Sequence, residues 1–230
     1  MNLYPIMLNI EGRLVAVIGG GEVALRKIHD LVAAGARVRV VSPVINQGIY
    51  SLMEEQGAEF EIMERVYRQG DLSGAALVIS ATDDPDVNRM VYEEACSSNI
   101  FINAADDPPN CSFYVPAAVR KGELLVTIST GGASPAYASR LRRQIENVIP
   151  AHTEKMLCVL RECRELLKSD SAFTGLNFTA RGELLKRIVN SDSLCDEMIA
   201  DYDRGELRGF LMRISGLTGA HGNPDSRDKD

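Results

Sequence analysis

Short apolar segments alternate with amphipathic segments along the first half of the chain. Residues 13–18 (RLVAVI) are apolar almost throughout, which is typical of a strand covered on both faces, and they run directly into three glycines. The next segment, 23–34, places its apolar residues near one helical face, and Gly35 predicts the end of that helix. The pattern therefore predicts a strand, a tight turn and a helix in succession.

The same alternation continues to about residue 103. Strands that alternate with helices need crossover connections, so the sheet is expected to be mostly parallel. The predicted fold class is α/β, with a Rossmann-type doubly wound parallel sheet. Further strands are expected at 37–41, 59–64, 76–81 and 100–103, and further helices at 46–56 and 86–97.

The pattern changes after Pro108-Pro109. Two strands are predicted at 112–117 and 124–129, connected through 120–123, and a helix is predicted from Ser134-Pro135 to about Val148. From Pro150 onward the pattern is helical, notably at 154–168 and 182–189. We therefore expect four parts: a Rossmann domain at 1–111, a small strand and helix element at 112–149, a C-terminal helical domain at 150–220, and a disordered tail at 221–230.

Composition and charge narrow the class of protein. Hydrophobic residues make up 45% and charged residues 25%, as in ordinary globular domains, and no apolar run is long enough to cross a bilayer. The net charge of -7 argues against general affinity for nucleic acid or for an anionic membrane. The N-terminus lacks a secretion signal, and the five cysteines show neither a CxxC pair nor metal-ligand spacing. We expect a cytoplasmic protein with reduced thiols and no resident metal.

The turn at residues 19–24 has the pattern G-x-G-x-x-A. Glycines permit a tight reversal and a close approach of the backbone to a pyrophosphate, and Ala24 permits close packing of the helix on the strand. Free N–H groups at the start of the helix favour a phosphate. A purely structural turn is the alternative, but the position after a buried strand and before a helix favours a dinucleotide site.

The end of the second predicted strand departs from the usual dinucleotide pattern. Val41-Ser42-Pro43 stand where a ribose-binding Asp or Glu is usual, which leaves the choice between NAD and NADP open. Arg37 and Arg39 lie within the strand and not at its tip, so the sequence favours NAD. We assign the cofactor site to Gly19, Gly21, Glu22, Val23, Ala24, Pro43, Val44 and Thr82.

Five segments, in the same order and spacing, resemble the siroheme synthase N-terminal family of precorrin-2 dehydrogenases, some of which are also sirohydrochlorin ferrochelatases. They are Tyr4-Pro5-Ile6, 19–27 (GGGEVALRK), 81–84 (ATDD), 103–108 (NAADDP) and 129–135 (STGGASP), within about residues 1–150. The resemblance implies NAD-dependent oxidation of precorrin-2 to sirohydrochlorin, and in some members the insertion of ferrous iron. It also implies a homodimer that exchanges the element at 112–149. No methyltransferase segment follows, so we expect the stand-alone form.

The resemblance assigns the role of catalytic acid or base to Asp106. Oxidation of precorrin-2 removes a hydride and a proton, and a carboxylate at the carboxyl end of a parallel strand lies where ligands of this fold bind. The same carboxylate could take a pyrrole proton during metal insertion. The alternative is that Asn103, Asp106 and Asp107 only form an Asx-type turn before two prolines. Asn103 is assigned to substrate binding, and Asp107 is the lesser catalytic candidate.

Two further features are candidates for contact with the substrate. The turn at 129–132 suits backbone contact with a carboxylate or the cofactor, although a structural connection fits equally, and Thr130 stands where some family members carry a modified serine. Arg140, with Arg142 and Arg143, could hold the carboxylates of precorrin-2, or could belong to a solvated helix with ordinary ion pairs. We assign Thr130 and Arg140 to substrate binding.

Two other classes of function compete with the dehydrogenase. A Rossmann domain can serve as a nucleotide-sensing regulatory module without catalysis, but such a protein needs an effector domain, and none is visible in the sequence. A protein that acts only as a chelatase would leave the dinucleotide site vestigial, and the intact glycine turn argues against that reading.

Overall fold

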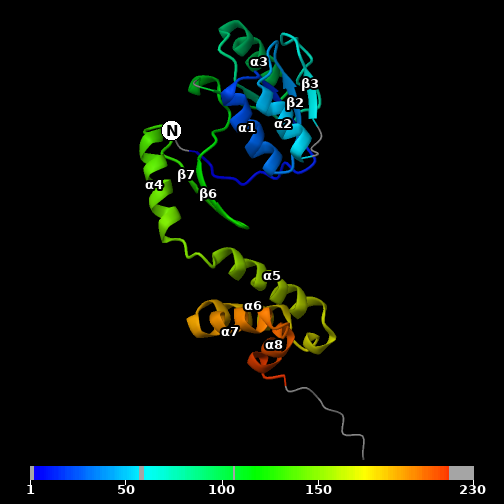
Figure 1. Cartoon of the computed structure of the whole chain (residues 1–230), viewed down its shortest axis with the longest axis vertical. Helices are drawn as coiled ribbons and strands as arrows, with labels where there is room; N and C mark the ends of the chain where they lie inside the picture. The colour runs from blue at the N-terminus through cyan, green and yellow to red at the C-terminus, as the bar shows by residue number, and fades with distance from the viewer. Residues whose placement is uncertain (1–2, 57–59, 106, 218–230) are drawn as a thin grey trace, which may run out of the picture. The chain divides into compact units, whose positions relative to one another are not determined.

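The computed structural model describes residues 3–56, 60–105 and 107–217 of the 230. The chain divides into two compact units, Met1–Val115 and Pro116–Asp230, which are described separately (Figure 1). The finer division of the second unit into an element at 112–149 and a helical domain at 150–220 stays a prediction. The tail predicted at 221–230 lies outside the described residues.

The first unit is built on a five-stranded parallel sheet with the order β3-β2-β1-β4-β5. This order reverses direction at β1, as in doubly wound folds, so the predicted fold class is confirmed. The strands are β1 (Leu14–Ile18), β2 (Arg37–Val41), β3 (Phe60–Met63), β4 (Leu77–Ser80) and β5 (Phe101–Ala104). The helices are α1 (Glu22–Ala33), α2 (Gln47–Gln56) and α3 (Pro85–Ser97), followed by the short η1 (Pro108–Asn110).

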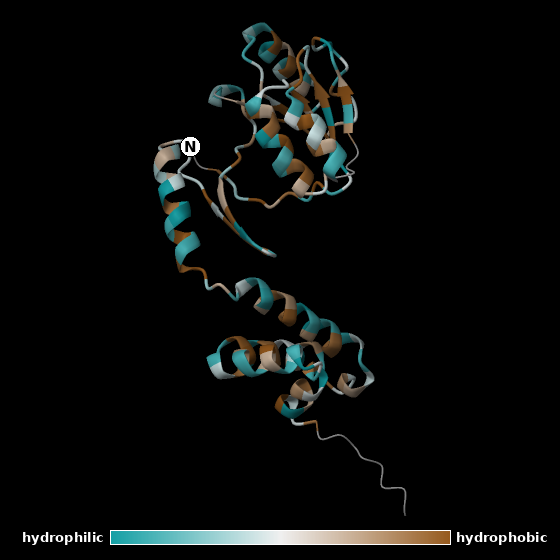
Figure 2. Cartoon of the chain, viewed as in Figure 1, coloured by the Kyte–Doolittle hydropathy of each residue, from teal (hydrophilic) through white to brown (hydrophobic). Residues whose placement is uncertain are grey.

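Both faces of this sheet are covered, which explains why the strands are apolar at nearly every position. Val15 and Val17 of β1 pack in one core with residues of α1 and α2. Ala16 and Ile18 point to the opposite face and pack in a second core with residues of α3. Side chains of a strand alternate between faces, so a strand between two cores cannot show the alternation of a half-exposed strand. Figure 2 shows these strands as mostly hydrophobic.

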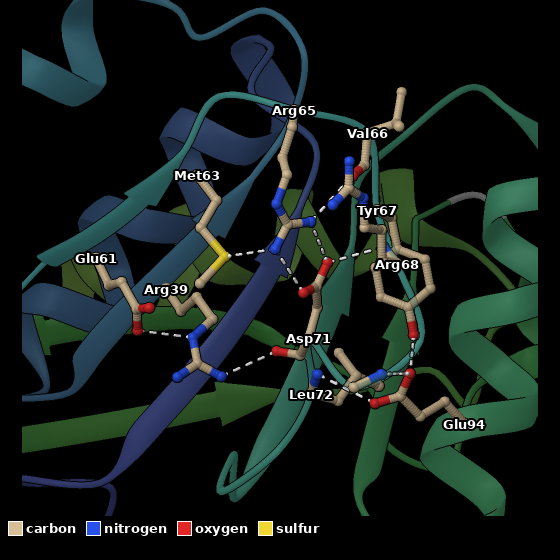
Figure 3. Close-up of polar contacts among 11 residues, drawn as sticks. Arg39, Glu61, Met63, Arg65, Val66, Tyr67, Arg68, Asp71, Leu72 and Glu94 are labelled. Atoms are coloured by element: carbon tan, nitrogen blue, oxygen red, sulfur yellow. Dashed lines mark hydrogen bonds and ion pairs between the residues drawn. The ribbon is translucent and has the colours of Figure 1, made fainter.

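The connection from β3 to β4 contains no helix, although it crosses the second face of the sheet. Tyr67, Leu72 and Ala75 of this connection are buried in the second core. Their backbone has no regular ladder, so buried polar groups need other partners. Glu94 of α3 supplies one: it accepts hydrogen bonds from the Tyr67 hydroxyl, from Gly70 N at 2.9 Å and from Leu72 N at 3.1 Å (Figure 3).

An ion pair closes the start of the same connection. The Arg65 guanidinium donates to both carboxylate oxygens of Asp71, at 2.7 and 2.8 Å (Figure 3). Asp71 also accepts from Arg68 N at 2.8 Å. The hydrogen bond from Arg65 holds the pKa of Asp71 below its ordinary value, against the opposing effect of burial. The pair therefore replaces, in part, the hydrogen bonds that a crossover helix would make within itself.

The second unit begins with an antiparallel pair, β6 (Ala117–Lys121) and β7 (Leu124–Ile128). The strand predicted at 112–117 is wrong. Ser112 and Phe113 both donate backbone N–H groups to Ile102 O in β5, at 2.8 and 3.4 Å, and Pro116 has no N–H to donate to a ladder. The strand therefore starts at Ala117, and the predicted connection at 120–123 is shorter, because residues 120 and 121 belong to β6.

Helices make up the rest of the second unit. They are α4 (Pro135–Val148), α5 (Thr153–Ser169), η2 (Ser171–Phe173), α6 (Phe178–Val189), α7 (Asp192–Asp203) and α8 (Leu207–Ser215). The prediction of helices after residue 150 is confirmed, and α5, α6, α7 and α8 enclose a core that includes Phe173, Met198 and Phe210. Among the helices of the described ranges, none has both the length and the apolar character needed to cross a membrane.

The connection between β3 and β4 yields a stability prediction. Replacing Asp71 by alanine leaves the Arg65 guanidinium and the Arg68 N–H without their acceptor, and we expect the free energy of unfolding at pH 7 to fall by about 2–3 kcal/mol. Because the pKa of Asp71 is lowered in the folded state, its contribution is present above about pH 4 and is lost below it. Urea denaturation at pH 7, pH 5 and pH 3.5 should show the difference from the wild type narrowing only at the lowest of these approximate values.

The control is Arg89→Ala, which removes an exposed ion pair with Asp86 in the same unit. We expect a change below about 0.5 kcal/mol at every pH. An Asp71→Ala effect no larger than that of the control would contradict the role given to the buried pair.

Candidate dinucleotide site

The glycine turn is held between the ends of two neighbouring strands. Gly19 has φ +120°, and a Cβ placed there would lie 2.1 Å from the carbonyl oxygen of Ala81, just after β4. A Cβ on Gly20 would lie 2.2 Å from the carbonyl oxygen of Val44, just after β2. Only glycine permits both approaches. The first two glycines therefore serve the packing of the turn itself.

Gly21 has a different environment. Nothing lies within 4 Å of a Cβ placed on it, and it precedes α1 as the N-cap residue without a side-chain hydrogen bond to the first turn. The start of α1 thus offers backbone N–H groups beside open space, an arrangement that suits a phosphate. Glu22 and Val23 are exposed at this end, whereas Ala24 is fully buried against the sheet. Ala24 therefore permits the close packing expected of the third motif position.

The loop after β2 presents an apolar surface. Pro43 is exposed, and Val44 is 76% exposed, the second highest exposure among the large hydrophobic side chains of this unit. Ser42 is buried, and its hydroxyl donates to Val44 O at 2.8 Å, which fixes the loop. An exposed aliphatic surface at this position suits the face of an adenine ring.

Asn46 ties this loop to the glycine turn, a contact that the sequence did not indicate. Its N–H donates to Gly20 O at 2.7 Å, and its side-chain Nδ2 donates to Glu22 Oε1 at 2.6 Å. Its Oδ1 accepts from Gly48 N at 2.8 Å, at the start of α2. The position before a predicted helix could have indicated the cap at Gly48, but not the contact with Glu22, which lies 24 residues away.

A second asparagine, Asn88 of α3, holds the loop after β4. The hydroxyl of the buried Ser80 donates to Asn88 Oδ1 at 2.6 Å, and Asn88 Nδ2 donates to Thr82 O at 3.0 Å. Thr82 Oγ1 also accepts from Asp84 N at 3.2 Å. Thr82 is thereby fixed beside Ala81, the residue that Gly19 contacts. The sequence analysis placed Thr82 in the site but missed Asn88.

Asn103 ends on the inside of the loop that follows β5. It is buried, and its Nδ2 donates to Phe113 O at 3.0 Å. The Cys111 thiol donates to Ala104 O at 3.2 Å and accepts from Ala104 N at 3.2 Å. Burial raises the pKa of this thiol, so it stays protonated and packs as an uncharged group. The amide nitrogen of Asn103 has a structural role, and its assignment to substrate binding stays a prediction.

Asp106 lies outside the described residues, so its catalytic role stays a prediction. The chain leaves β5 at Ala105, whose N–H donates to Ser80 O at 2.8 Å at the carboxyl edge of the sheet. Asp107, the lesser candidate, accepts from Asn110 Nδ2 at 2.7 Å. That bond is typical of a turn, so the structural alternative explains Asp107 well.

Thr130 and Arg140 belong to the second unit. The Thr130 hydroxyl accepts from Ser134 N at 3.1 Å and donates to Ser134 O at 3.2 Å, so it shapes the turn before α4. Arg142 pairs with Glu146 at 2.8 Å within the helix. Arg140 is exposed and has no hydrogen bond or ion pair to any described residue. Of the arginine cluster, Arg140 therefore has the side chain most available to an anion.

The edge of the first unit has the form of a dinucleotide crevice. The predicted cofactor residues from the glycine turn, the loop after β2 and the loop after β4 come together at the carboxyl ends of β1, β2 and β4. This is the point where the strand order reverses and where ligands of doubly wound sheets bind. Across the described ranges, no group of three or more His, Cys, Asp or Glu side chains is gathered as a metal site would be.

The contrast between the glycines gives the second prediction. Gly19→Ala forces a Cβ onto the Ala81 carbonyl at positive φ, so we expect stability to fall by about 3 kcal/mol or more. Gly21→Ala meets nothing in the protein and should change stability by less than about 1 kcal/mol. The added methyl occupies the space over the start of α1, so NADH affinity, followed by fluorescence titration, should fall roughly tenfold or more. Unchanged affinity in Gly21→Ala would place the pyrophosphate elsewhere.

Comparison with known proteins agrees with this geometry. Residues 6–117 match a family model described as "Putative NAD(P)-binding", and residues 121–147 match one described as "Sirohaem biosynthesis protein central". The chain is 43% identical over 151 residues to a siroheme synthase of Pseudomonas aeruginosa, covering 66% of this chain and 32% of that protein. It is 30% identical over 222 residues to a siroheme synthase of Photobacterium profundum, covering 96% and 46%.

A solved structure named SirC, precorrin-2 dehydrogenase, is similar with a TM-score of 0.72 and 27% sequence identity, covering 93% of this chain and 100% of that one. The chain spans only about a third to a half of the length of the siroheme synthases it matches. Two family models nonetheless follow each other along residues 6–147, on a fold with an open glycine turn at its switch point. The chain belongs to the siroheme synthase N-terminal family, which includes precorrin-2 dehydrogenases.

Proposed function

We propose that this chain oxidises precorrin-2 to sirohydrochlorin with NAD as the hydride acceptor. The observation that carries the proposal is the open start of α1 at Gly21, at the switch point of the sheet, in a chain of this family. The similarity to SirC, a precorrin-2 dehydrogenase by name, extends over 93% of the chain and supports the same substrate. A regulatory module without catalysis has no comparable support.

The residues of the crevice divide the work of binding. The N–H groups at the start of α1 receive the pyrophosphate, and the exposed Pro43 and Val44 lie under the adenosine end. The loop fixed at Thr82 borders the nicotinamide end. NAD, when bound, supplies the acceptor for the hydride that leaves the substrate carbon. The proton released in the same oxidation passes to a base, and we assign that role to the carboxylate of Asp106.

The carboxylates of the substrate need a positive partner in a chain of net charge -7. Arg140 supplies one, since it is exposed and has no partner among the described residues, whereas Arg142 is engaged with Glu146. Ferrous iron would enter as a second substrate if the same chain also inserts it into sirohydrochlorin. Asp106 would then accept a pyrrole proton.

We propose a homodimer assembled through the start of the second unit. The sheet of β6 and β7 has two strands only, and an isolated pair of strands is marginally stable in water. Among the residues of α4, only Ala138 is buried, while Tyr137 and Val148 are large and exposed. A second copy that supplies strands and a helix would cover these surfaces. We also propose a cytoplasmic location, because the five cysteines are all free thiols.

The activity test is direct. Incubating the protein with precorrin-2 and NAD should develop the absorbance of NADH together with the spectrum of sirohydrochlorin. Asp106→Asn should keep NADH affinity within about twofold and lower turnover by roughly 100-fold or more, since it removes the proton acceptor without a change of size. Asp107→Asn serves as the matched control and should keep most of the turnover. No dependence on NAD would sink the proposal, and full turnover in Asp106→Asn would remove that residue from the chemistry. Ferrous iron is added in a separate reaction.

The dimer can be tested by light scattering on a size-exclusion column. We expect twice the mass of one chain for the wild type. Tyr137→Asp places a charge on the exposed surface of α4, which should shift the population toward monomer without unfolding the first unit. Arg143→Asp, on the same helix, is the control for a change of charge alone. A monomeric wild type at concentrations of about 50 μM would exclude the assembly as a stable state.

A further inference from the structure

The end of β2 offers no charged group to the adenosine ribose. In this fold an acidic side chain at that place usually binds the ribose hydroxyls and disfavours the 2′-phosphate of NADP. Here Ser42 is buried with its hydroxyl donated to Val44 O at 2.8 Å, and Pro43 is the next residue. The choice between NAD and NADP must therefore be made by another group.

A carboxylate reaches the same loop from the start of α1. Glu22 is the first residue of that helix, and its Oε1 accepts from Asn46 Nδ2 at 2.6 Å. Asn46 is itself fixed, because its N–H donates to Gly20 O at 2.7 Å and its Oδ1 accepts from Gly48 N at 2.8 Å. The Glu22 carboxylate is thereby anchored between the glycine turn and the loop that carries Val44.

The arginine at the centre of β2 is not available to a phosphate. The Arg39 guanidinium donates to Glu61 at 2.7 Å and to the carbonyl oxygens of Asp71 and Ser73, each at 3.0 Å (Figure 3). Its charge is therefore compensated within the unit. Arg26, one helical turn after Glu22, lines the groove between α1 and α2 together with Glu22. It is the cation best placed to receive a phosphate if the carboxylate beside it were neutral.

We propose that Glu22, anchored by Asn46, selects NAD over NADP. The carboxylate accepts hydrogen bonds from the ribose hydroxyls, as an acid at the end of β2 would do. A 2′-phosphate would bring a second negative charge next to it, and like charges in such contact are costly. Asn46 is a positioning residue in this scheme. The inference rests on the proposed function and goes beyond it by naming the residue that sets cofactor preference.

Equilibrium titrations with NADH and with NADPH, followed by nucleotide fluorescence, test the inference without any turnover. The wild type should bind NADH at least about tenfold more tightly than NADPH at low salt. The preference should shrink as potassium chloride is raised, since the screening length falls from about 30 Å at 0.01 M to about 8 Å at 0.15 M. Glu22→Gln, which keeps the size and removes the charge, should lose most of the preference through a gain in NADPH affinity.

Two further variants separate positioning from charge. Asn46→Ser keeps a helix-capping oxygen near Gly48 N but is too short to reach Glu22, so the preference should fall without loss of thermal stability. Glu54→Gln removes an exposed carboxylate from α2 and should leave the preference unchanged. Equal affinity of the wild type for both nucleotides, or a preference that survives Glu22→Gln, would overturn the inference and leave the proposed function standing. Binding of neither nucleotide would overturn both.

Discussion

The contact of the glycine turn with the two strand ends beside it is the constraint on which the site depends. Gly19 touches the carbonyl that follows β4, and Gly20 touches the carbonyl that follows β2, at distances that no side chain would allow. These contacts fix three strand ends relative to one another before any ligand is considered. They also aim the start of α1 at the crevice, so that Gly21 and its free surface lie where a phosphate can approach. Fold and cofactor site are therefore set by the same backbone contacts.

Much of this could be predicted from the sequence, because the signals are local. An apolar run that ends in glycines predicts a buried strand and its turn, and the order of the first unit follows from the alternation of strands and helices. The strand expected at 112–117 failed because its composition suits a strand but its donors go to Ile102, a partner that lies outside the segment. Pairing between distant segments leaves no periodic signal in either of them.

The connection from β3 to β4 shows the same limit from the opposite direction. Nothing in residues 64–76 resembles a helix, and the chain still covers one face of the sheet. Glu94 makes this possible, since one carboxylate satisfies a hydroxyl and two backbone donors of the connection. Arg65 and Asp71 close its other side. Irregular backbone can therefore replace a crossover helix, provided that a few side chains accept the hydrogen bonds that the helix would have kept internal.

The site residues that the sequence missed share one property. Asn46 and Asn88 hold the loops after β2 and β4, and Asn103 holds the segment after β5. An amide can donate and accept at once, so one uncharged side chain can fix a loop at two points. Charged residues in these places would also fix the loops, but a carboxylate would repel a pyrophosphate and an arginine would compete for it. Neutral amides leave the field at the crevice to the start of α1, and they leave Glu22 as the charged side chain that Asn46 anchors there.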